Sequence, residues 1–295
     1  MDTATADKST NVRLSQQGPR REALPPAVRA AVGFVSRVAP SWAQSQAEKM
    51  FFTPRGKRGF LPPRGPGMAL PFNLRSGPYK VTGYSFGAGP LVLLAHGWSG
   101  HARQLARFIT PLVEGGKRVV AIDMPAHGAS TGKEATLFDM AKAIRDVAAV
   151  CGQIEGAIGH SLGAAALTWA LRKGLEVERV VLLAPALEPS GFAHRVSTGL
   201  GLDDSAEPGF VARIEARVGR SMESMRLSQH VGELGAEALI LHDPEDDEIP
   251  LEHAQELAAH WPNSTLDTVP GVGHHGILKS PWVVERATRF LVQPS

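Results

Sequence analysis

The sequence predicts an α/β fold in which helices flank a mostly parallel, twisted sheet. Short apolar runs of strand length alternate with helical segments, and they lie at residues 91–95, 118–122, 177–183 and 236–241. Such alternation is typical of βαβ units, whose strands are buried on both faces and are therefore continuously apolar. At 295 residues, the chain is long enough for one large α/β domain or two small ones.

Weaker patterns add further elements to this sheet. Residues 79–86 predict an antiparallel entry strand, and residues 153–158 predict a strand mainly because they lead into a serine turn. Residues 265–269 are the last strand candidate. Between the strands, a helix opens at Thr136 and another begins at Pro250, each with apolar residues at helical spacing.

The chain before the sheet divides into two parts. Residues 1–22 are polar and aperiodic, which predicts a disordered arm, and residues 23–68 predict two short helices followed by a Pro/Gly/Arg-rich linker. A capping box at Ser41 is expected to open the second helix, with Trp42 among the residues of its apolar side. Such helices more often dock onto their own domain or onto a partner subunit than onto lipid, so a homo-oligomer formed through them is one expectation.

Within the predicted domain, residues 69–295, the strand–helix alternation lapses from about residue 186 to residue 234. A helical stripe runs there from Phe210 to Val218, and Met222 and Met225 follow it. A helical insertion between two core strands predicts a small lid over the ends of the sheet. Its side chains either line an acyl pocket or form the lid's own core, and the second interpretation is favoured.

Composition limits the classes of function. Residues 1–80 contain 13 Lys and Arg against 4 Asp and Glu, whereas the remainder contains 18 against 25. No nucleic-acid-binding motif accompanies the basic segment, which favours a solvated arm and no nucleic-acid partner. The single cysteine excludes an intrachain disulfide. No apolar run reaches the roughly 18 residues of a membrane span, and no secretory signal is visible, so we expect a cytoplasmic protein.

A serine at a sharp turn is the candidate nucleophile. Residues 159–163 read Gly-His-Ser-Leu-Gly and lie between a strand candidate and a helix candidate at 164–171. A strand–turn–helix holds its serine in a cramped backbone, so glycines must flank it. The helix N-terminus then favours a developing oxyanion near Ser161. The alternative is a structural serine that caps the helix, and His160 is expected to pack against the sheet.

An acid and a base follow the serine in chain order. A hydroxyl is a poor nucleophile unless a base takes its proton, so the three groups have meaning only as a set. The loop after the strand at 236–241 contains five acidic residues, of which Asp246 is the candidate triad acid and Asp247 the alternative. A glycine-rich loop near the C-terminus offers His274 as the base, with His275 as the alternative.

Two backbone N–H groups are needed to stabilise the oxyanion. One is expected from Leu162, directly after the serine. The second is expected from Trp98, because residues 96–100 read His-Gly-Trp-Ser-Gly and follow the strand at 91–95. Glycines on both sides of Trp98 let the backbone approach a substrate closely.

These motifs together resemble the α/β-hydrolase superfamily from about Pro71 to the C-terminus. The shared segments are residues 96–98, 123–130, 159–163, 246–250 and 273–274. The resemblance implies a serine hydrolase of the esterase or lipase type, with Ser161 as nucleophile, Asp246 as acid and His274 as base. It also implies Trp98 and Leu162 as oxyanion donors. The chain departs from the pattern at Asp243, where the family often has glycine after the strand histidine.

We therefore expect an enzyme that cleaves a carboxylic ester or thioester of a small-molecule acyl substrate through an acyl-enzyme on Ser161. Neither a cofactor nor a metal is implied by the motifs. Serine peptidases, acyltransferases, carbon–carbon hydrolases and perhydrolases share the same triad and remain alternatives. A ligand-binding scaffold without catalysis is an alternative of another class, because a fold does not fix a function.

Overall fold

The computed structural model describes residues 24–56 and 62–293, and eight strands of this part of the chain form one sheet. The arm predicted for residues 1–22 lies outside the described residues. The strands are β1 (Leu70–Ser76), β2 (Tyr79–Phe86), β3 (Leu91–Ala95), β4 (Arg118–Asp123), β5 (Ile154–His160), β6 (Arg179–Leu183), β7 (Glu237–His242) and β8 (Ser264–Thr268). Their order is β1-β2-β4-β3-β5-β6-β7-β8, antiparallel at β1–β2 and β2–β4 and otherwise parallel. The predicted fold class is confirmed.

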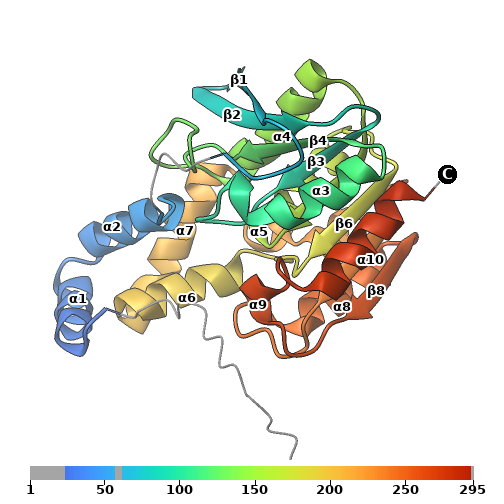
Figure 1. Ribbon diagram of the computed structural model, residues 1–295. Helices are drawn as coiled ribbons and strands as arrows, with labels where there is room; N and C mark the ends of the chain where they lie inside the picture. Colours follow the sequence, from blue (N-terminus) through green and yellow to red (C-terminus); the bar gives the residue numbers. More distant parts are fainter. Residues whose placement is uncertain (1–23, 57–61, 294–295) are drawn as a thin grey trace, which may run out of the picture.

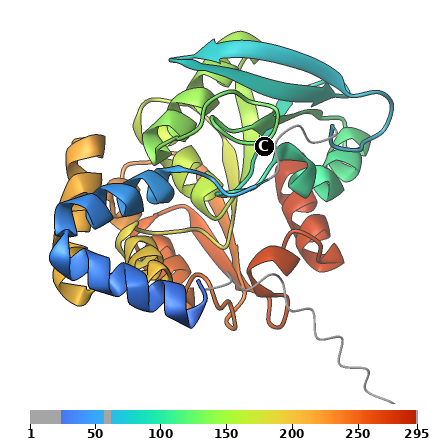
Figure 2. The ribbon, with the colours of Figure 1, turned by 90° about the vertical axis from the view of Figure 1, so that its left-hand side faces the viewer.

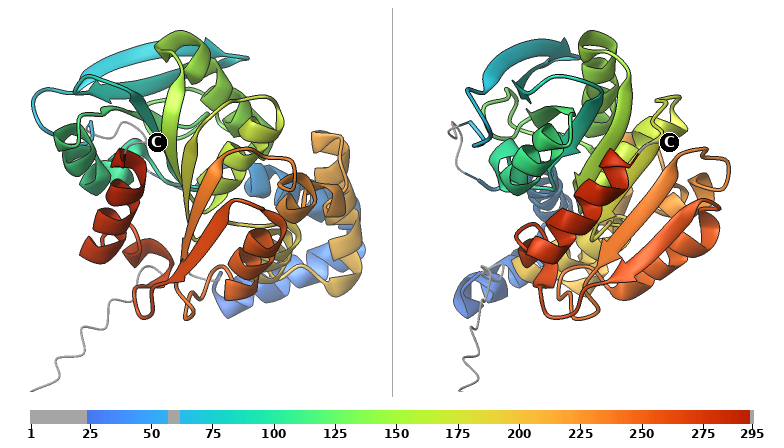
Figure 3. Two further views of the ribbon diagram at one scale, coloured as in Figure 1. Left: turned by 90° about the vertical axis from the view of Figure 1, so that its right-hand side faces the viewer. Right: turned by 45° about the vertical axis from the view of Figure 1, so that its right-hand side comes forward.

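Helices cover both faces of this sheet (Figure 3). On one face lie α3 (Ala106–Glu114) and α10 (Pro281–Val292), and on the other lie α4 (Leu137–Cys151), α5 (Leu162–Arg172) and α8 (Leu251–His260). Side chains of β3 enter the two cores alternately. Leu91 and Leu93 pack on the α4–α5 side, whereas Val92 and Leu94 pack on the α3–α10 side. This burial on both faces explains why the strand is continuously apolar.

The edge strand β1 was not predicted from the sequence. Its second residue, Pro71, argues against a strand, because proline has no N–H to donate to a neighbouring chain. At the sheet edge this loss is tolerated, since β1 pairs only with β2 along its one bonded side. The hydroxyl of Thr82 also donates to Asn73 at 2.9 Å and joins the two strands through side chains.

Two N-terminal helices, α1 (Pro26–Val38) and α2 (Pro40–Phe52), form where helices are predicted. The predicted apolar side of the second helix is wrong in part, since Trp42 is 61% exposed. The buried side chains of α2 are Ala43, Ala47, Phe51 and Phe52. The predicted capping box at Ser41 is also wrong, because the helix begins at Pro40 and Ala39 at its N-cap makes no side-chain bond. Proline at the first position presets a helical φ instead.

The insertion between β6 and β7 contains α6 (Ser190–Leu200) and α7 (Glu207–Val218), which pack against α1 and α2. We call these four helices the helical cap, and Figures 1 and 2 show them gathered at one side of the molecule. Phe210, Met222 and Met225 are buried inside the cap region. This burial agrees with the favoured interpretation, in which they form the core of the insertion.

Aromatic contacts and ion pairs fasten α2 to α7. The ring of Phe51 lies edge-on to that of Phe210, with centroids 6.0 Å apart. Glu48 accepts a hydrogen bond of 2.9 Å from Arg213, and the guanidinium of Arg217 lies 4.3 Å from the ring centre of Phe52. The N-terminal helices are therefore packed into the cap rather than standing apart from it. No helix in the described ranges is long and apolar enough to cross a membrane.

Candidate active site

Ser161 lies at the turn where β5 ends and α5 begins. Its φ of 53° and ψ of −120° are unusual for a residue with a side chain. The flanking glycines are required because neighbouring backbone atoms lie too close to leave room for a side chain. A Cβ at Gly159 would lie 2.6 Å from Cα of Ala164, and one at Gly163 would lie 2.4 Å from the carbonyl oxygen of Ala95. The strained turn therefore depends on glycine at both positions, as expected for a serine presented by a strand–turn–helix.

The two predicted oxyanion donors lie on either side of this turn. Leu162 is the first residue of α5, and the loop containing Trp98 follows β3. A Cβ at Gly97 would lie 3.0 Å from Cβ of Ser161, so the two loops are in direct contact. Among hydrogen bonds between described residues, none uses the N–H of Trp98 or of Leu162. Both groups are therefore available to an acceptor in the site.

A buried polar network supports the loop of Trp98. The Nδ1–H of His96 donates to the carbonyl of Gly97 at 2.7 Å, and its Nε2 accepts from the N–H of Met124 at 3.0 Å. Burial holds the pKa of His96 well below its ordinary value, so the ring is neutral. His127 accepts from the N–H of Ser99 at 3.0 Å. Sequence reasoning missed these roles, because a bond between distant loops leaves no local pattern.

Asp246 and His274 are brought together by the loops after β7 and β8. Nδ1 of His274 donates to Oδ2 of Asp246 at 2.7 Å, and the two side chains are 4% and 0% exposed. Oδ1 of Asp246 accepts from the N–H groups of Glu248 and Ile249. Burial acts to raise the pKa of Asp246, but the bonds from His274 and from the backbone outweigh it and hold the pKa below its ordinary value.

The two alternative residues point to different surroundings. Asp247 is exposed, and the described residues give its side chain no hydrogen bond. His275 is exposed, and its Nε2 lies 3.1 Å from the carboxylate of Glu248. That hydrogen bond raises the pKa of His275 despite partial burial. The structure therefore pairs Asp246 with His274 and leaves Asp247 and His275 at the surface.

Asp243, the departure from the family pattern, connects the acid loop to the base loop. Its side chain is buried and accepts hydrogen bonds from the N–H groups of Gly271 and Gly273, immediately before His274. It also accepts from the N–H of Glu245 at 2.9 Å. Sequence reasoning treated Asp243 as one acidic residue among five, since nothing local indicates a bond across about thirty residues. Its place directly after a buried strand was the available signal.

Ser161 and His274 lie at the same edge of the sheet. His160, the residue before the serine, has its ring centre 4.8 Å from that of His274. Within the part of the chain that the structure describes, the hydroxyl of Ser161 makes no hydrogen bond, and the ring of His274 bonds to Asp246 alone. Catalytic hydrogen bonds are often long without substrate and tighten in the complex. Asp246 and His274 are thus hydrogen-bonded to each other, whereas the hydroxyl of Ser161 has no hydrogen bond among the described residues.

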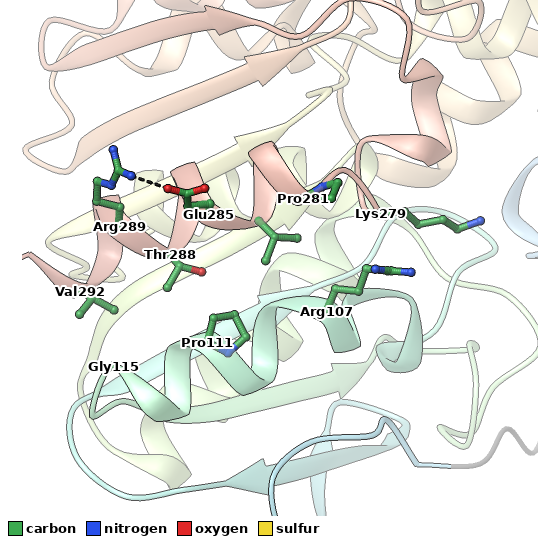
Figure 4. Close-up of a pocket in the computed structure, with 10 residues that line it drawn as sticks. Arg107, Pro111, Gly115, Lys279, Pro281, Glu285, Thr288, Arg289 and Val292 are labelled. Carbon is green, nitrogen blue, oxygen red and sulfur yellow. Dashed lines mark hydrogen bonds and ion pairs between the residues drawn. The ribbon is translucent and has the colours of Figure 1, made fainter. Parts of the chain in front are cut away.

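A surface groove of about 580 Å³ lies elsewhere, between α3 and α10 (Figure 4). Arg107 and Lys279 lie at one end of it, and the ion pair of Glu285 with Arg289 lies along α10. The groove contains none of the predicted site residues. Its size therefore carries no weight against the strand-end loops, which contain the candidate nucleophile, base and acid.

Comparisons with known proteins find several that are similar to this chain. Residues 88–201 match the family described as serine aminopeptidase, S33. The human protein ABHD12B is 26% identical over 225 residues, which cover 68% of this chain and 60% of that protein. The 2-hydroxy-6-oxo-6-phenylhexa-2,4-dienoate hydrolase of Burkholderia cepacia is 24% identical over 242 residues, which cover 64% of this chain and 82% of that protein.

A solved structure has the same fold. Est1E from Butyrivibrio proteoclasticus, bound to ferulic acid, is similar at a TM-score of 0.62 and 23% identity, over 75% of this chain and 98% of that chain. The family match, the fold and the resemblance of the motifs agree. This chain has the α/β-hydrolase fold and is similar in sequence to hydrolases. The chain spans only 60% of the length of the human relative, so that protein's own activity is not transferred.

Proposed function

We propose that the protein is a serine hydrolase that cleaves a carboxylic ester or thioester through an acyl-enzyme on Ser161. The hydrogen bond between Nδ1 of His274 and Asp246, formed beside a serine in a strained turn, carries this proposal. A carboxylate that binds the proton at Nδ1 leaves Nε2 as the acceptor for the serine proton. The low pKa of Asp246 keeps this carboxylate ionised at neutral pH.

In the proposed reaction, Nε2 of His274 takes the proton of Ser161 while the serine oxygen attacks the acyl carbon. The N–H groups of Leu162 and Trp98 donate to the oxyanion of the tetrahedral intermediate. His274 then gives the proton to the departing alcohol or thiol, which leaves the acyl group on the serine oxygen. A water molecule, deprotonated by the same ring, releases the carboxylic acid and restores Ser161.

Esters and thioesters are proposed ahead of amides because their leaving groups depart more readily when a single histidine supplies the proton. The matched family is described by an aminopeptidase activity, and the Burkholderia relative is named for a dienoate substrate. Both activities are therefore tested alongside esters. Peptidase, acyltransferase, carbon–carbon hydrolase and perhydrolase activity, and a binding role without catalysis, are the alternatives that the experiment separates.

We also propose that the helical cap is the lid of this site. The insertion that contains α6 begins beside the nucleophile, where the N–H of Ala186 donates to the carbonyl of Ser161 at 3.4 Å. Phe192 on α6 packs against Phe51 of α2, with ring centres 5.0 Å apart. A Phe192→Ala variant is expected to change the ratio of rates on long and short p-nitrophenyl esters. An unchanged ratio in a folded variant contradicts the lid role.

The function is tested with a panel of p-nitrophenyl esters, acyl thioesters and aminoacyl anilides, using wild type and Ser161→Ala. The proposal expects ester or thioester turnover, with an acyl adduct on Ser161 that acid quenching traps for mass spectrometry. The Ser161→Ala variant is expected to be folded and inactive. Turnover of anilides alone overturns the ester assignment, and no turnover or adduct in folded wild type favours the binding role.

A further inference from the structure

His160 occupies the variable position before the nucleophile, yet it is one of the most enclosed polar side chains of the site. It is 2% exposed, and its Nε2 lies 3.0 Å from the backbone carbonyl oxygen of His274. A carbonyl oxygen only accepts, so Nε2 must carry the proton and donate it. The expectation from the sequence, that His160 packs against the sheet, omits this bond across 114 residues.

Three strand-end loops meet at this imidazole. Its own backbone leads directly into Ser161, and its Nε2–H holds the loop of His274. On the remaining side, a Cβ at Gly97 would lie 3.0 Å from Nδ1 of His160, so the loop of the oxyanion donor packs onto the ring. The ring of His160 therefore touches the nucleophile turn, the base loop and the oxyanion loop at once.

The ring of His160 is neutral. Burial is the main cause that lowers the pKa of His160 to about 3, and the neighbouring ring of His274 acts in the same direction. His275 also lowers this pKa, and Asp246 acts to raise it. Nδ1 of His160 is buried and has no hydrogen-bond partner among the described residues. The ring thus makes a single directional bond, which goes to the residue that bears the catalytic base.

The loop of His274 is consequently fixed at two backbone points. Asp243 accepts from the N–H of Gly273 on one side, and His160 donates to the carbonyl of His274 on the other. Asp246 then sets the rotation of the ring through Nδ1. The bond to Asp246 alone leaves the distance between the ring and the serine free, because both acid and base belong to the C-terminal half of the sheet.

We propose that His160 is a positioning residue, whose Nε2–H donates to the His274 carbonyl and sets the distance between the catalytic base and Ser161. This inference rests on the proposed function. Misplacement of a catalytic group by about 1 Å is enough to cost about 100-fold in rate. His160 touches no reacting atom, so its loss lowers the turnover number and leaves substrate affinity nearly unchanged.

Amide side chains give a matched pair of variants. In His160→Gln the amide nitrogen falls at the position of Nε2 and donates to the same carbonyl. In His160→Asn the amide nitrogen falls at the position of Nδ1, one bond too short to reach it. His160→Phe keeps the aromatic volume without a donor. Thermal unfolding of all three variants identifies the temperature range in which each is folded for kinetics.

The expected result is a kcat for His160→Gln within about threefold of wild type, and a fall of about 100-fold for His160→Asn and His160→Phe, with KM changed less than about twofold. Donor position, and not ring shape, then controls the rate. Equal falls in kcat for all three variants, or normal kcat in His160→Phe, overturn the positioning role.

A second readout does not depend on turnover. In wild type and Ser161→Ala, the Nδ1 proton of His274 is expected to give a downfield NMR signal because it is bonded to Asp246. This signal should persist in His160→Gln and shift or vanish in His160→Asn and His160→Phe. An unchanged signal in all variants contradicts the inference. If the signal changes across the variants as expected but the protein cleaves no ester or thioester, the proposed function is rejected and the positioning of His274 by His160 is not.

Discussion

Two adjacent histidines each pair with a carboxylate of the same loop, and the two pairs differ most in their burial. His274 and Asp246 are 2.7 Å apart, with side chains 4% and 0% exposed. His275 and Glu248 are 3.1 Å apart, with side chains 45% and 37% exposed. The chemistry of the two pairs is the same, whereas the first is enclosed by protein and the second is in water.

The difference shows what burial adds to a histidine–carboxylate pair. Water screens the exposed pair, and such pairs contribute little to stability. In the enclosed pair, the side chain of Asp246 is shielded from bulk solvent and is held by two backbone N–H groups and one ring. The orientation of His274 is therefore fixed before a substrate arrives, which is the condition for efficient base catalysis.

The largest expected effect comes from substituting a member of the buried pair, with a surface residue of the same loop as the control. Asp246→Asn should lower kcat by about 10⁴-fold, because the amide favours the wrong tautomer of His274. Its matched control, Asp247→Asn, should remain within about twofold of wild type, since surface changes have small effects. His274→Gln and His275→Gln form the second matched pair. Steady-state ester hydrolysis measures all four, and equal losses in Asp246→Asn and Asp247→Asn would remove the contrast.

The helical cap repeats the contrast between buried and exposed side chains. Phe51 is 8% exposed and Trp42 is 61% exposed, although both belong to α2. Phe51→Ala should lower the free energy of unfolding by about 3–5 kcal/mol through the cavity it leaves. Trp42→Ala should change it by less than about 0.5 kcal/mol in a monomer. Denaturant titration measures both values.

Trp42→Ala also tests the homo-oligomer expected through the N-terminal helices, which stays a prediction. If these helices join subunits, the variant should lower the solution mass measured by light scattering. A mass equal to one protomer in wild type and variant alike rejects the oligomer.

A smaller effect is expected at Asp243, whose side chain hydrogen-bonds the loop of Asp246 to the loop of His274. In Asp243→Asn, one buried N–H would face an amide N–H instead of a carboxylate oxygen, at a cost of about 1–3 kcal/mol. We expect kcat to fall by about 10- to 100-fold as the loop of His274 loosens. The control is Glu245→Gln, whose exposed side chain should leave kcat unchanged. A normal kcat in folded Asp243→Asn would show that Asp246 alone is sufficient to place the base.

The smallest effect concerns how stability depends on pH. The contribution of the buried pair is lost as pH falls, whereas that of the exposed pair is lost as pH rises. The pKa of Asp246 is lowered in the folded state, so its contribution is present above the unfolded value and is lost as pH falls through the folded pKa. The pKa of His275 is raised, so its contribution is present below the unfolded value and is lost as pH rises through the folded pKa.

Unfolding temperatures of wild type and His275→Gln check the second of these effects. The variant should be slightly less stable near about pH 5.5 and equal to wild type near about pH 9. The reverse order would contradict the raised pKa of His275.

Patterns within one segment were predictable from the sequence. The apolar run of β3 gave a buried strand, and the capping box of Thr136 with Asp139 starts α4, where a helix is predicted to open. The glycines around Ser161 likewise reflect local crowding that leaves a mark in the sequence. The same holds for the resemblance that indicates the superfamily, because its motifs are short and contiguous.

Features set by distant contacts were not predictable. β1 was missed because Pro71 is compatible with a strand only at a sheet edge, which depends on the neighbours. The exposed side of α2 was misjudged, since packing against α7 buries two alanines and leaves Trp42 outside. Asp243 and His160 bond to backbone groups of a loop far along the chain. No local spacing encodes such bonds.

The most direct test of the central claim is the rate at which a fluorophosphonate modifies Ser161, followed by intact-protein mass and peptide mapping. One adduct, on Ser161, is expected in wild type and Asp247→Asn, with slow labelling in Asp246→Asn and none in Ser161→Ala. Labelling of wild type at another residue, or equal rates in Asp246→Asn and wild type, would contradict the claim that the buried acid–base pair activates this serine.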